Sequence, residues 1–221
     1  MGCDNVTSVL GIPKDRPPQP HPTPNAGSKP PGFPSLKTLD TLDFAAQPGI
    51  NKPLVLELAR GDYLDVQENV LFMGNPGTGK THLATALGHS ACAQGKRVRF
   101  FTVTGLVTQL LEAREERQLE RLFNRLSKYH LIILDEFGYV PFTKAGAELL
   151  FEVVSRAYER QSILLTTNLP FSQWERTFKD PMTTAAAIDR LVHHSVTLEL
   201  NIDSYRMAAA QRKKKGEKQH T

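Results

Sequence analysis

The sequence predicts an α/β fold in which helices cover both faces of a five-stranded parallel sheet. Two observations carry this prediction. Short apolar runs with the length of buried strands recur along the chain, and longer stretches with helical spacing of apolar residues lie between them. Such alternation is typical of a parallel sheet in a three-layer arrangement. The expected strands are 70–73, 98–103, 131–134, 163–167 and 195–200.

Each element has its own local signal. Helical spacing of Leu54, Leu58 and Ala59 precedes the first strand. The second strand is β-branched and aromatic, whereas the third and fourth are short apolar runs. Trp174 and Phe178 are four residues apart, which predicts that they are core residues or a hydrophobic staple. The expected helices are 81–94, 105–128, 144–159 and about 183–193.

The charge of the chain is unevenly distributed. The 221 residues carry a net charge of +4. Residues 206–221 contain six basic residues and one acidic residue, so this tail carries +5 and residues 1–205 sum to −1. The body is therefore near neutral, and net charge alone does not indicate a nucleic-acid-binding protein. No window approaches the ~20 apolar residues of a membrane span. Cys3 and Cys92 match no metal or redox spacing, so we expect a cytoplasmic protein.

The amino-terminal segment is rich in proline. Eleven of the 15 prolines fall within the first 53 residues. Proline cannot supply helix or ladder hydrogen bonds, which predicts a disordered arm over 1–32 with order beginning near Phe33. The arm could be a peptide ligand for a proline-binding partner or a solvated leader, and its composition favours the leader.

A phosphate-binding loop follows the first strand and precedes the first long helix. Its glycines let backbone N–H groups turn inward towards phosphate oxygens, and the helix adds its positive end. Lys80 is expected to reach the β- and γ-phosphates of ATP, and the Thr81 hydroxyl to ligate Mg²⁺. The alternative is a glycine-rich turn without a ligand. The motif consists of Gly74, Asn75, Pro76, Gly77, Thr78, Gly79, Lys80 and Thr81.

Two adjacent carboxylates follow the apolar run 131–134. Asp135 at the carboxyl end of a buried strand is expected to hold Mg²⁺. Glu136 points elsewhere and is expected to orient and deprotonate the attacking water. As an isolated dipeptide the pair could equally be surface acids, but after a P-loop the pattern indicates a nucleotide hydrolase. Asn168 follows the next strand, where its amide could contact the γ-phosphate or the lytic water, or simply begin the turn into Pro170.

With these motifs in order, the chain resembles the AAA+ ATPases, and more closely the IstB-type helpers of insertion-sequence transposition, which are related to the DnaC helicase loaders. The resemblance covers about residues 33–206. It is carried by segments that include FPSLKTLDTLDFAAQP, NVLFMGNPGTGKTHLATALG, LIILDEFGYVPF, AIDRLVHHSVTLEL and SYRM. It implies a P-loop NTPase domain over 33–205, a short helix and basic tail over 206–221, and a minimal or absent lid. Family members usually begin with a helical module, which the proline-rich arm does not resemble.

The resemblance also implies residue roles and partners. Asn168 takes the sensor-1 position. Arg190 matches the arginine finger, which reaches the γ-phosphate bound by a neighbouring subunit, and Arg206 matches sensor 2. The implied protein is an ATPase that uses ATP and Mg²⁺, forms an ATP-dependent homo-oligomer on DNA, and recruits or activates a transposase.

One helical stripe could contact DNA. On the predicted helix 105–128, five cations recur at steps of three and four residues, which places them along one stripe. The stripe could bind the phosphate backbone or simply face water. Its members are Arg114, Arg117, Arg121, Arg125 and Lys128. The tail 212–215 could add nonspecific attraction to DNA. His193 and His194 do not predict a metal site, because adjacent helical residues diverge by about 100°; we expect them to pack before the last strand.

Three other functions remain open. A helicase loader of the DnaC type would share the ATP chemistry but engage a helicase. A metabolic P-loop kinase would need an acceptor pocket and a lid. A truncated remnant would bind nucleotide without a DNA function.

Overall fold

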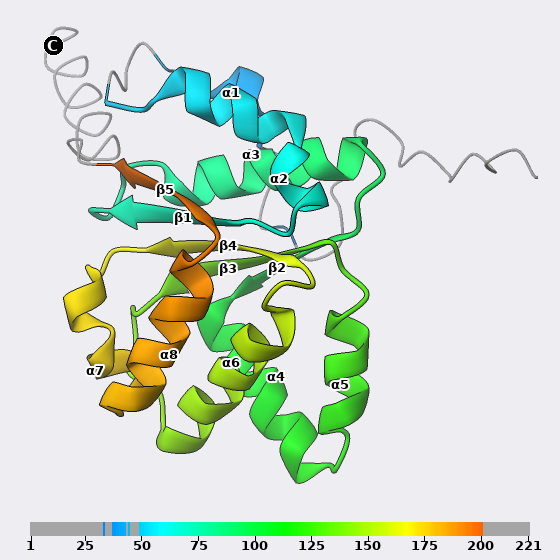
Figure 1. Cartoon of the computed structure of the whole chain (residues 1–221), viewed down its shortest axis with the longest axis vertical. Helices are drawn as coiled ribbons and strands as arrows, with labels where there is room; N and C mark the ends of the chain where they lie inside the picture. Colours follow the sequence, from blue (N-terminus) through cyan, green and yellow to red (C-terminus); the bar gives the residue numbers. More distant parts are fainter. Residues whose placement is uncertain (1–32, 34–36, 43, 45–48, 201–221) are drawn as a thin grey trace, which may run out of the picture.

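The computed structural model describes residues 33, 37–42, 44 and 49–200 (Figure 1). The predicted arm 1–32, Arg206 and the basic tail lie outside the described residues. Within the described part of the chain, no helix has the length and apolar character needed to cross a membrane.

Five parallel strands form one sheet in the order β2-β3-β4-β1-β5. This order places β4 between β1, which leads into the P-loop, and β3, which carries the adjacent carboxylates. The strands are β1 (Asn69–Gly74), β2 (Val98–Thr102), β3 (Leu131–Phe137), β4 (Ser162–Thr167) and β5 (Ser195–Leu200). The predicted α/β fold with a five-stranded parallel sheet is confirmed.

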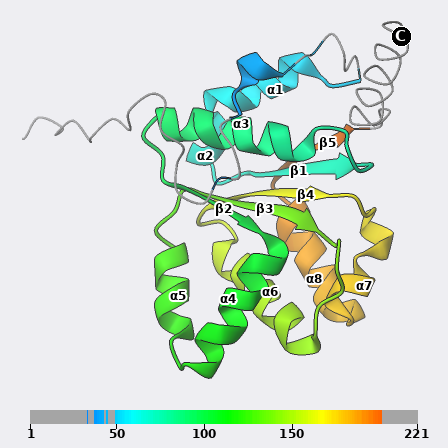
Figure 2. The ribbon, with the colours of Figure 1, turned by 180° about the vertical axis from the view of Figure 1, so that it is seen from behind.

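Helices cover both faces of the sheet, as Figures 1 and 2 show. One face is covered by α1 (Lys52–Arg60), α2 (Asp62–Asp65) and α3 (Lys80–Ala93), with the short 3₁₀ helix η1 (Leu39–Thr41) beside α3. The other is covered by α4 (Val103–Glu115), α5 (Leu119–Leu126), α6 (Lys144–Ala157), α7 (Glu175–Phe178) and α8 (Pro181–Val192). A second 3₁₀ helix, η2 (Phe171–Gln173), precedes α7.

One apolar core lies on each side of the sheet. Alternate residues of a strand point to opposite faces. Accordingly, Ile132 of β3 packs in the core beneath α4 and α6, whereas Ile133 packs in the core beneath α1 and α3. Trp174 and Phe178 are buried in the first of these cores, as their spacing predicts.

Phe33, where the folded domain is expected to begin, is buried against α3. It is 1% exposed, and its ring centroid lies 4.8 Å from that of His89 and 5.5 Å from that of Phe100. A Cβ added to Gly88 would lie 2.7 Å from the Phe33 ring. The small residue on α3 therefore lets the aromatic ring approach the helix backbone.

The prediction of a single helix over 105–128 is wrong. The chain forms α4 and α5, separated by a turn in which Arg117 has a φ of +57°. Gln118 N–H donates to Ala113 O (2.7 Å) and Arg117 N–H to Arg114 O (3.2 Å). These are the two bonds of a Schellman ending, which usually places glycine where Arg117 stands. The continuous stripe of five cations therefore does not exist.

Candidate nucleotide site

The P-loop connects the end of β1 to the start of α3. Gly77 and Gly79 have φ values of +84° and +93°, a left-handed conformation that glycine adopts without strain. The Thr78 side chain is fully buried, and its hydroxyl donates to Asn75 O at 2.9 Å. Left-handed residues within such a loop form an anion-binding concavity of backbone N–H groups. The loop therefore has the conformation that its sequence predicts.

Lys80 begins α3 and reaches back over this loop. Its Nζ donates to the carbonyl oxygens of Gly74 and Asn75, both at 2.7 Å. The ammonium group is thereby held at the loop itself, the place where the phosphate-binding role requires a cation.

Asp135 is the centre of a buried polar cluster beside the loop. It lies on β3 and is 3% exposed. Its Oδ1 accepts hydrogen bonds from the Thr81 hydroxyl (3.0 Å) and the Thr166 hydroxyl (2.5 Å). Burial raises the pKa of the Asp135 carboxyl, while the bonds from Thr166 and Thr81 and the charge of Lys80 oppose that rise. A cation bound here would therefore stabilise the ionised form of the Asp135 carboxyl.

The oxygens of this cluster fit a magnesium ion. Adjacent ligands of octahedral Mg²⁺, at 2.0–2.1 Å from the metal, lie about 2.9 Å apart. The observed separation between Thr81 Oγ1 and Asp135 Oδ1 is 3.0 Å. A hydroxyl and a carboxylate are also the hard oxygen donors that this cation prefers.

Glu136 faces away from that cluster. It has a φ of +64° and an exposed side chain, and it sits in the irregularity of the β3–β4 register between Leu134 and Phe137. Its backbone N–H donates to the Thr166 hydroxyl at 3.0 Å. The strand prediction ended at Leu134, whereas β3 continues through both carboxylates to Phe137. The neighbouring carboxylates occupy opposite environments, one buried and one exposed.

Asn168 also lies at this edge. It follows Thr167, the last residue of β4, and it is half-buried. The register pairs Thr167 with Met73, directly before the P-loop glycine. Asn168 is therefore brought to the same end of the sheet as the loop and Asp135.

Thr166 is a site residue that sequence reasoning missed. Its hydroxyl joins Asp135 to the backbone of Glu136 and is 1% exposed. A polar residue near the carboxyl end of the apolar strand 163–167 was the available signal. The sequence does not reveal the strand order, which places β4 directly beside β3.

Arg190 lies at the other end of the sheet. The buried side chain of Asn69, the first residue of β1, donates to Arg190 O (3.3 Å) and Leu191 O (3.2 Å). The P-loop follows Gly74 at the other end of β1, about 17 Å away at the ordinary rise of a strand. The Arg190 guanidinium is half-buried, donates to Ala186 O (3.1 Å) and lies 4.9 Å from the Phe151 ring centroid. The structure therefore does not bring Arg190 to the P-loop of its own chain.

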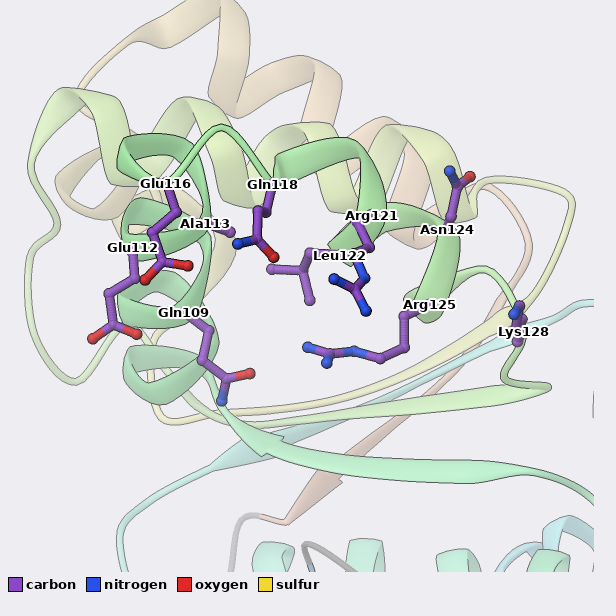
Figure 3. A pocket seen from close by; sticks show the side chains of 10 residues that line it. All are labelled: Gln109, Glu112, Ala113, Glu116, Gln118, Arg121, Leu122, Asn124, Arg125 and Lys128. Carbon is purple, nitrogen blue, oxygen red and sulfur yellow. The ribbon is translucent and has the colours of Figure 1, made fainter.

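Three of the five predicted stripe cations remain together. Arg121, Arg125 and Lys128 line a cavity of about 810 Å³ between α4 and α5, with Glu112 and Glu116 on the α4 side (Figure 3). Within the described residues, none of the three cations makes an ion pair. We call these three cations the cationic wall; the two carboxylates on the α4 side line the same cavity.

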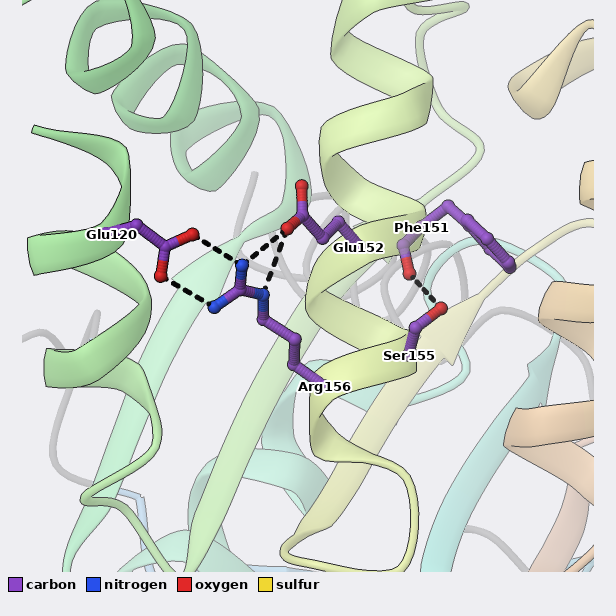
Figure 4. Close-up of polar contacts among 5 residues, drawn as sticks. All are labelled: Glu120, Phe151, Glu152, Ser155 and Arg156. Atoms are coloured by element: carbon purple, nitrogen blue, oxygen red, sulfur yellow. Dashed lines mark hydrogen bonds and ion pairs between the residues drawn. The ribbon is translucent and has the colours of Figure 1, made fainter. Parts of the chain in front are cut away.

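Arg156 of α6 is linked to α5 through Glu120 (Figure 4). Its two Nη atoms donate to the Glu120 carboxylate at 3.0 and 2.6 Å, and Nε donates to Glu152 at 3.0 Å. Its guanidinium carbon lies 4.0 Å from the Phe123 ring centroid. The hydrogen bonds and charge of Arg156 lower the pKa of Glu120. This exposed network links α5 to α6 without using the three wall cations.

Solved structures share this fold. The chain matches AMPPCP-bound DnaA from Aquifex aeolicus with a TM-score of 0.65 and 18% identity, over 83% of this chain and 56% of that one. It matches the crystal structure of DnaI with a TM-score of 0.62 and 14% identity, over 74% and 90%. The DnaC helicase loader matches with a TM-score of 0.53 and 20% identity, over 66% and 86%. The predicted P-loop NTPase fold is confirmed.

Sequence comparisons identify nearer relatives. An insertion sequence IS21 putative ATP-binding protein of Pseudomonas aeruginosa is 44% identical over 175 residues, which are 79% of this chain and 66% of the relative. A putative insertion sequence ATP-binding protein of Sinorhizobium fredii is 45% identical over 184 residues, 83% of this chain and 62% of the relative. The chain thus spans slightly less than two thirds of the length of these relatives. A family model described as IstB-like ATP binding protein matches residues 27–214. The chain therefore belongs to the IstB-like ATP binding protein family.

Proposed function

We propose that this chain is a Mg²⁺-dependent ATPase that assists DNA transposition by assembling on DNA and recruiting or activating a transposase. The observation that carries the ATPase proposal is the contact of Thr81 and Thr166 with Asp135 beside the P-loop, with Glu136 exposed next to it. Insertion-sequence relatives named as ATP-binding proteins support the transposition role.

Each site residue has a distinct role in the proposed hydrolysis. The loop N–H groups and Lys80 bind the phosphates. Thr81 and Asp135 would hold Mg²⁺, which when bound supplies charge neutralisation for the transferred phosphoryl group. Glu136 orients the attacking water and accepts its proton, because its carboxylate lies outside the hydrogen-bonded cluster that surrounds Asp135. Asn168 contacts the γ-phosphate or that water from the end of β4.

Arg190 completes the site of a neighbouring subunit. Its distance from its own P-loop, set by the length of β1, supports a role in trans. A cation supplied to the transferred phosphoryl group can be worth about three to five orders of magnitude in rate. Hydrolysis would then require an oligomer, which couples nucleotide state to assembly. Arg206, proposed as sensor 2, lies outside the described residues.

The cationic wall is the proposed DNA contact. Arg121, Arg125 and Lys128 have no ion-pair partner among the described residues, so phosphates could bind them without breaking an ion pair, with Glu112 and Glu116 on the opposite side of the cavity. Replacing Arg121 or Arg125 with alanine is expected to weaken DNA binding for all sequences and to reduce the salt slope by about one per lost phosphate contact. Equal salt slopes for wild type and both variants would remove this wall from the DNA interface.

The principal alternative is a helicase loader, which the structural likeness to the DnaC helicase loader favours. Affinity capture with the matching transposase and with a replicative helicase distinguishes the two functions. Binding to the helicase alone would replace the transposition proposal. Phosphate release without a small-molecule acceptor would exclude a metabolic kinase, and absence of any DNA effect would favour the remnant.

The test of the ATPase proposal is hydrolysis measured against DNA and protein concentration for wild type and Glu136→Gln. The variant is expected to bind ATP but to hydrolyse it about 10²- to 10⁴-fold more slowly, because the amide cannot accept the proton. Glu148→Gln, which changes an exposed acid on α6, is the matched control and should hydrolyse at the wild-type rate. Equal rates for Glu136→Gln and wild type would refute the role of Glu136 as base.

A further inference from the structure

Two turns meet at the edge of the sheet opposite the P-loop. Tyr158 and Glu159 follow α6, and His193 and His194 follow α8. One ligand atom from each of Glu159, His193 and His194 lies within 4.8 Å of the other two, and all three side chains are exposed. Two imidazoles and a carboxylate, distant in the sequence, are thus brought together by the fold.

The expectation that the two histidines pack before the last strand is wrong, because both are exposed; His193 caps α8 with right-handed helical dihedral angles (φ −52°, ψ −40°), and His194 follows it. The rings of His193 and His194 have centroids 4.3 Å apart and an interplanar angle of 75°. Although His193 keeps a helical backbone, ligand atoms of both rings lie within 4.8 Å of each other and can therefore face one ion.

The backbone beneath these side chains is fixed by hydrogen bonds. His193 N–H donates to Asp189 O at 2.9 Å, and His194 O accepts from Asn69 N–H at 2.7 Å. The latter bond ties the second histidine to the first residue of β1. Because the backbone is held in place, side-chain rotation alone can bring the three ligand atoms to metal-binding distance.

Tyr158 gives His193 a hydrogen-bond partner on the side of the ring away from the proposed ion, a position that a carboxylate, carbonyl or water usually takes. Its hydroxyl oxygen lies 3.2 Å from His193 Nδ1. When Nδ1 carries the proton and donates to this oxygen, Nε2 presents its lone pair for coordination. The same outer contact orients the ring. The cluster therefore comprises three ligands and one orienting partner.

We propose that Glu159, His193 and His194 bind a divalent transition metal of the zinc class. Imidazole nitrogen with carboxylate oxygen is a donor set typical of Zn²⁺, whereas Mg²⁺ prefers oxygen alone. Ligands of tetrahedral zinc lie on the order of 3.4 Å apart. The separations within 4.8 Å therefore close by small rotations of exposed side chains. Water completes the coordination.

This site is separate from the proposed nucleotide site. His194, Glu159 and Arg190 line one cavity of about 240 Å³ at the start of β1, a full strand length from the P-loop. The metal would therefore add positive charge beside the arginine that acts in trans and not beside its own nucleotide.

The test is a Zn²⁺ titration of the full chain in competition with a chromophoric zinc chelator, in nucleotide-free buffer. Wild type is expected to bind one ion at this site. Glu159→Gln and His194→Ala should each weaken that binding by more than about tenfold, and Tyr158→Phe by about tenfold, the lower end of the effect of losing an outer partner. Glu148→Gln, which changes an exposed acid on α6 outside the ligand set, is the matched control and should retain wild-type affinity.

Co²⁺ substitution provides a second readout. Its visible spectrum should show nitrogen and oxygen ligation in wild type and should change in Glu159→Gln, whose fold is checked by circular dichroism. Full zinc affinity in the double variant His193→Ala/His194→Ala would place the ion elsewhere, for example on His21, His220 or Cys3, and would overturn the proposal. Absence of zinc binding by folded wild type would overturn it as well.

Discussion

The two edges of the sheet differ in the burial of their functional side chains and in the hydrogen-bond partners that the chain itself supplies. At the carboxyl edge, Asp135 is buried and already accepts two hydroxyl hydrogen bonds, and Lys80 is held over the P-loop. At the amino edge, Glu159, His193 and His194 are exposed, and the Arg190 guanidinium bonds to a carbonyl of its own helix. The first edge has the arrangement of a nucleotide site, whereas the second presents exposed polar side chains and an arginine that is far from its own P-loop.

This difference has a physical reason. A buried carboxylate is costly unless it is hydrogen-bonded, so the cluster around Asp135 must be satisfied within the chain. Exposed groups carry no such requirement, and water satisfies them until a ligand or a neighbouring subunit arrives. We therefore expect substitutions at the carboxyl edge to affect the nucleotide site of their own chain. Substitutions at the amino edge should affect hydrolysis through the assembly of subunits.

The largest expected effect comes from Arg190→Ala. Hydrolysis should fall by about 10³-fold or more because the transferred phosphoryl group loses a cation, while nucleotide binding persists. Arg160→Ala removes an exposed arginine at the same edge and should leave the rate unchanged. The measurement is the hydrolysis rate over a range of protein concentrations. A wild-type hydrolysis rate in Arg190→Ala would contradict the proposal that the amino edge contributes to a neighbouring subunit's site.

A smaller effect is expected from Thr166→Val, which removes the hydroxyl between Asp135 and Glu136. Loss of an outer-shell hydrogen bond should reduce magnesium affinity or activity about 10- to 100-fold. Thr167→Val is the control: this neighbouring threonine is equally buried, but its hydroxyl donates to Phe137 O. Magnesium-dependent hydrolysis is compared with thermal stability for both variants. If the two variants lose the same activity, Thr166 only supports the fold.

The smallest expected effect concerns Glu120→Gln, which removes the charge that Arg156 pairs with. The pKa of Glu120 is lower in the folded protein than in the unfolded chain. The ionised side chain therefore stabilises the fold at a pH above its unfolded-state pKa, and this stabilisation is lost as the pH falls through its folded-state pKa. Unfolding by urea should therefore show a slight destabilisation of the variant at neutral pH, slight because water screens an exposed pair. A difference that persists undiminished in acid, where Glu120 is protonated, would contradict this account of the α5–α6 contact.

The sequence predicted the sheet well because each strand has a local apolar signal. It placed the P-loop, Asp135 and Glu136 at strand ends because these motifs are defined by their spacing next to a strand. It could not predict the break at Arg117, since a non-glycine residue occupies the left-handed position of the helix ending. It also missed Thr166 and the meeting of Glu159 with the two histidines at 193–194, which depend on strand order and on turns between distant elements.

The most direct test of a site shared between subunits is a mixing experiment with two inactive variants. Lys80→Ala lacks the phosphate-binding cation of its own site, and Arg190→Ala lacks the cation that we assign to its neighbour's site. Mixed oligomers should contain interfaces in which an intact P-loop faces an intact Arg190. We therefore predict that a one-to-one mixture regains ATP hydrolysis well above the sum of the two separate variants. A mixture that hydrolyses no faster than that sum, in samples shown to form mixed oligomers, would contradict the assignment of Arg190 to the neighbouring site.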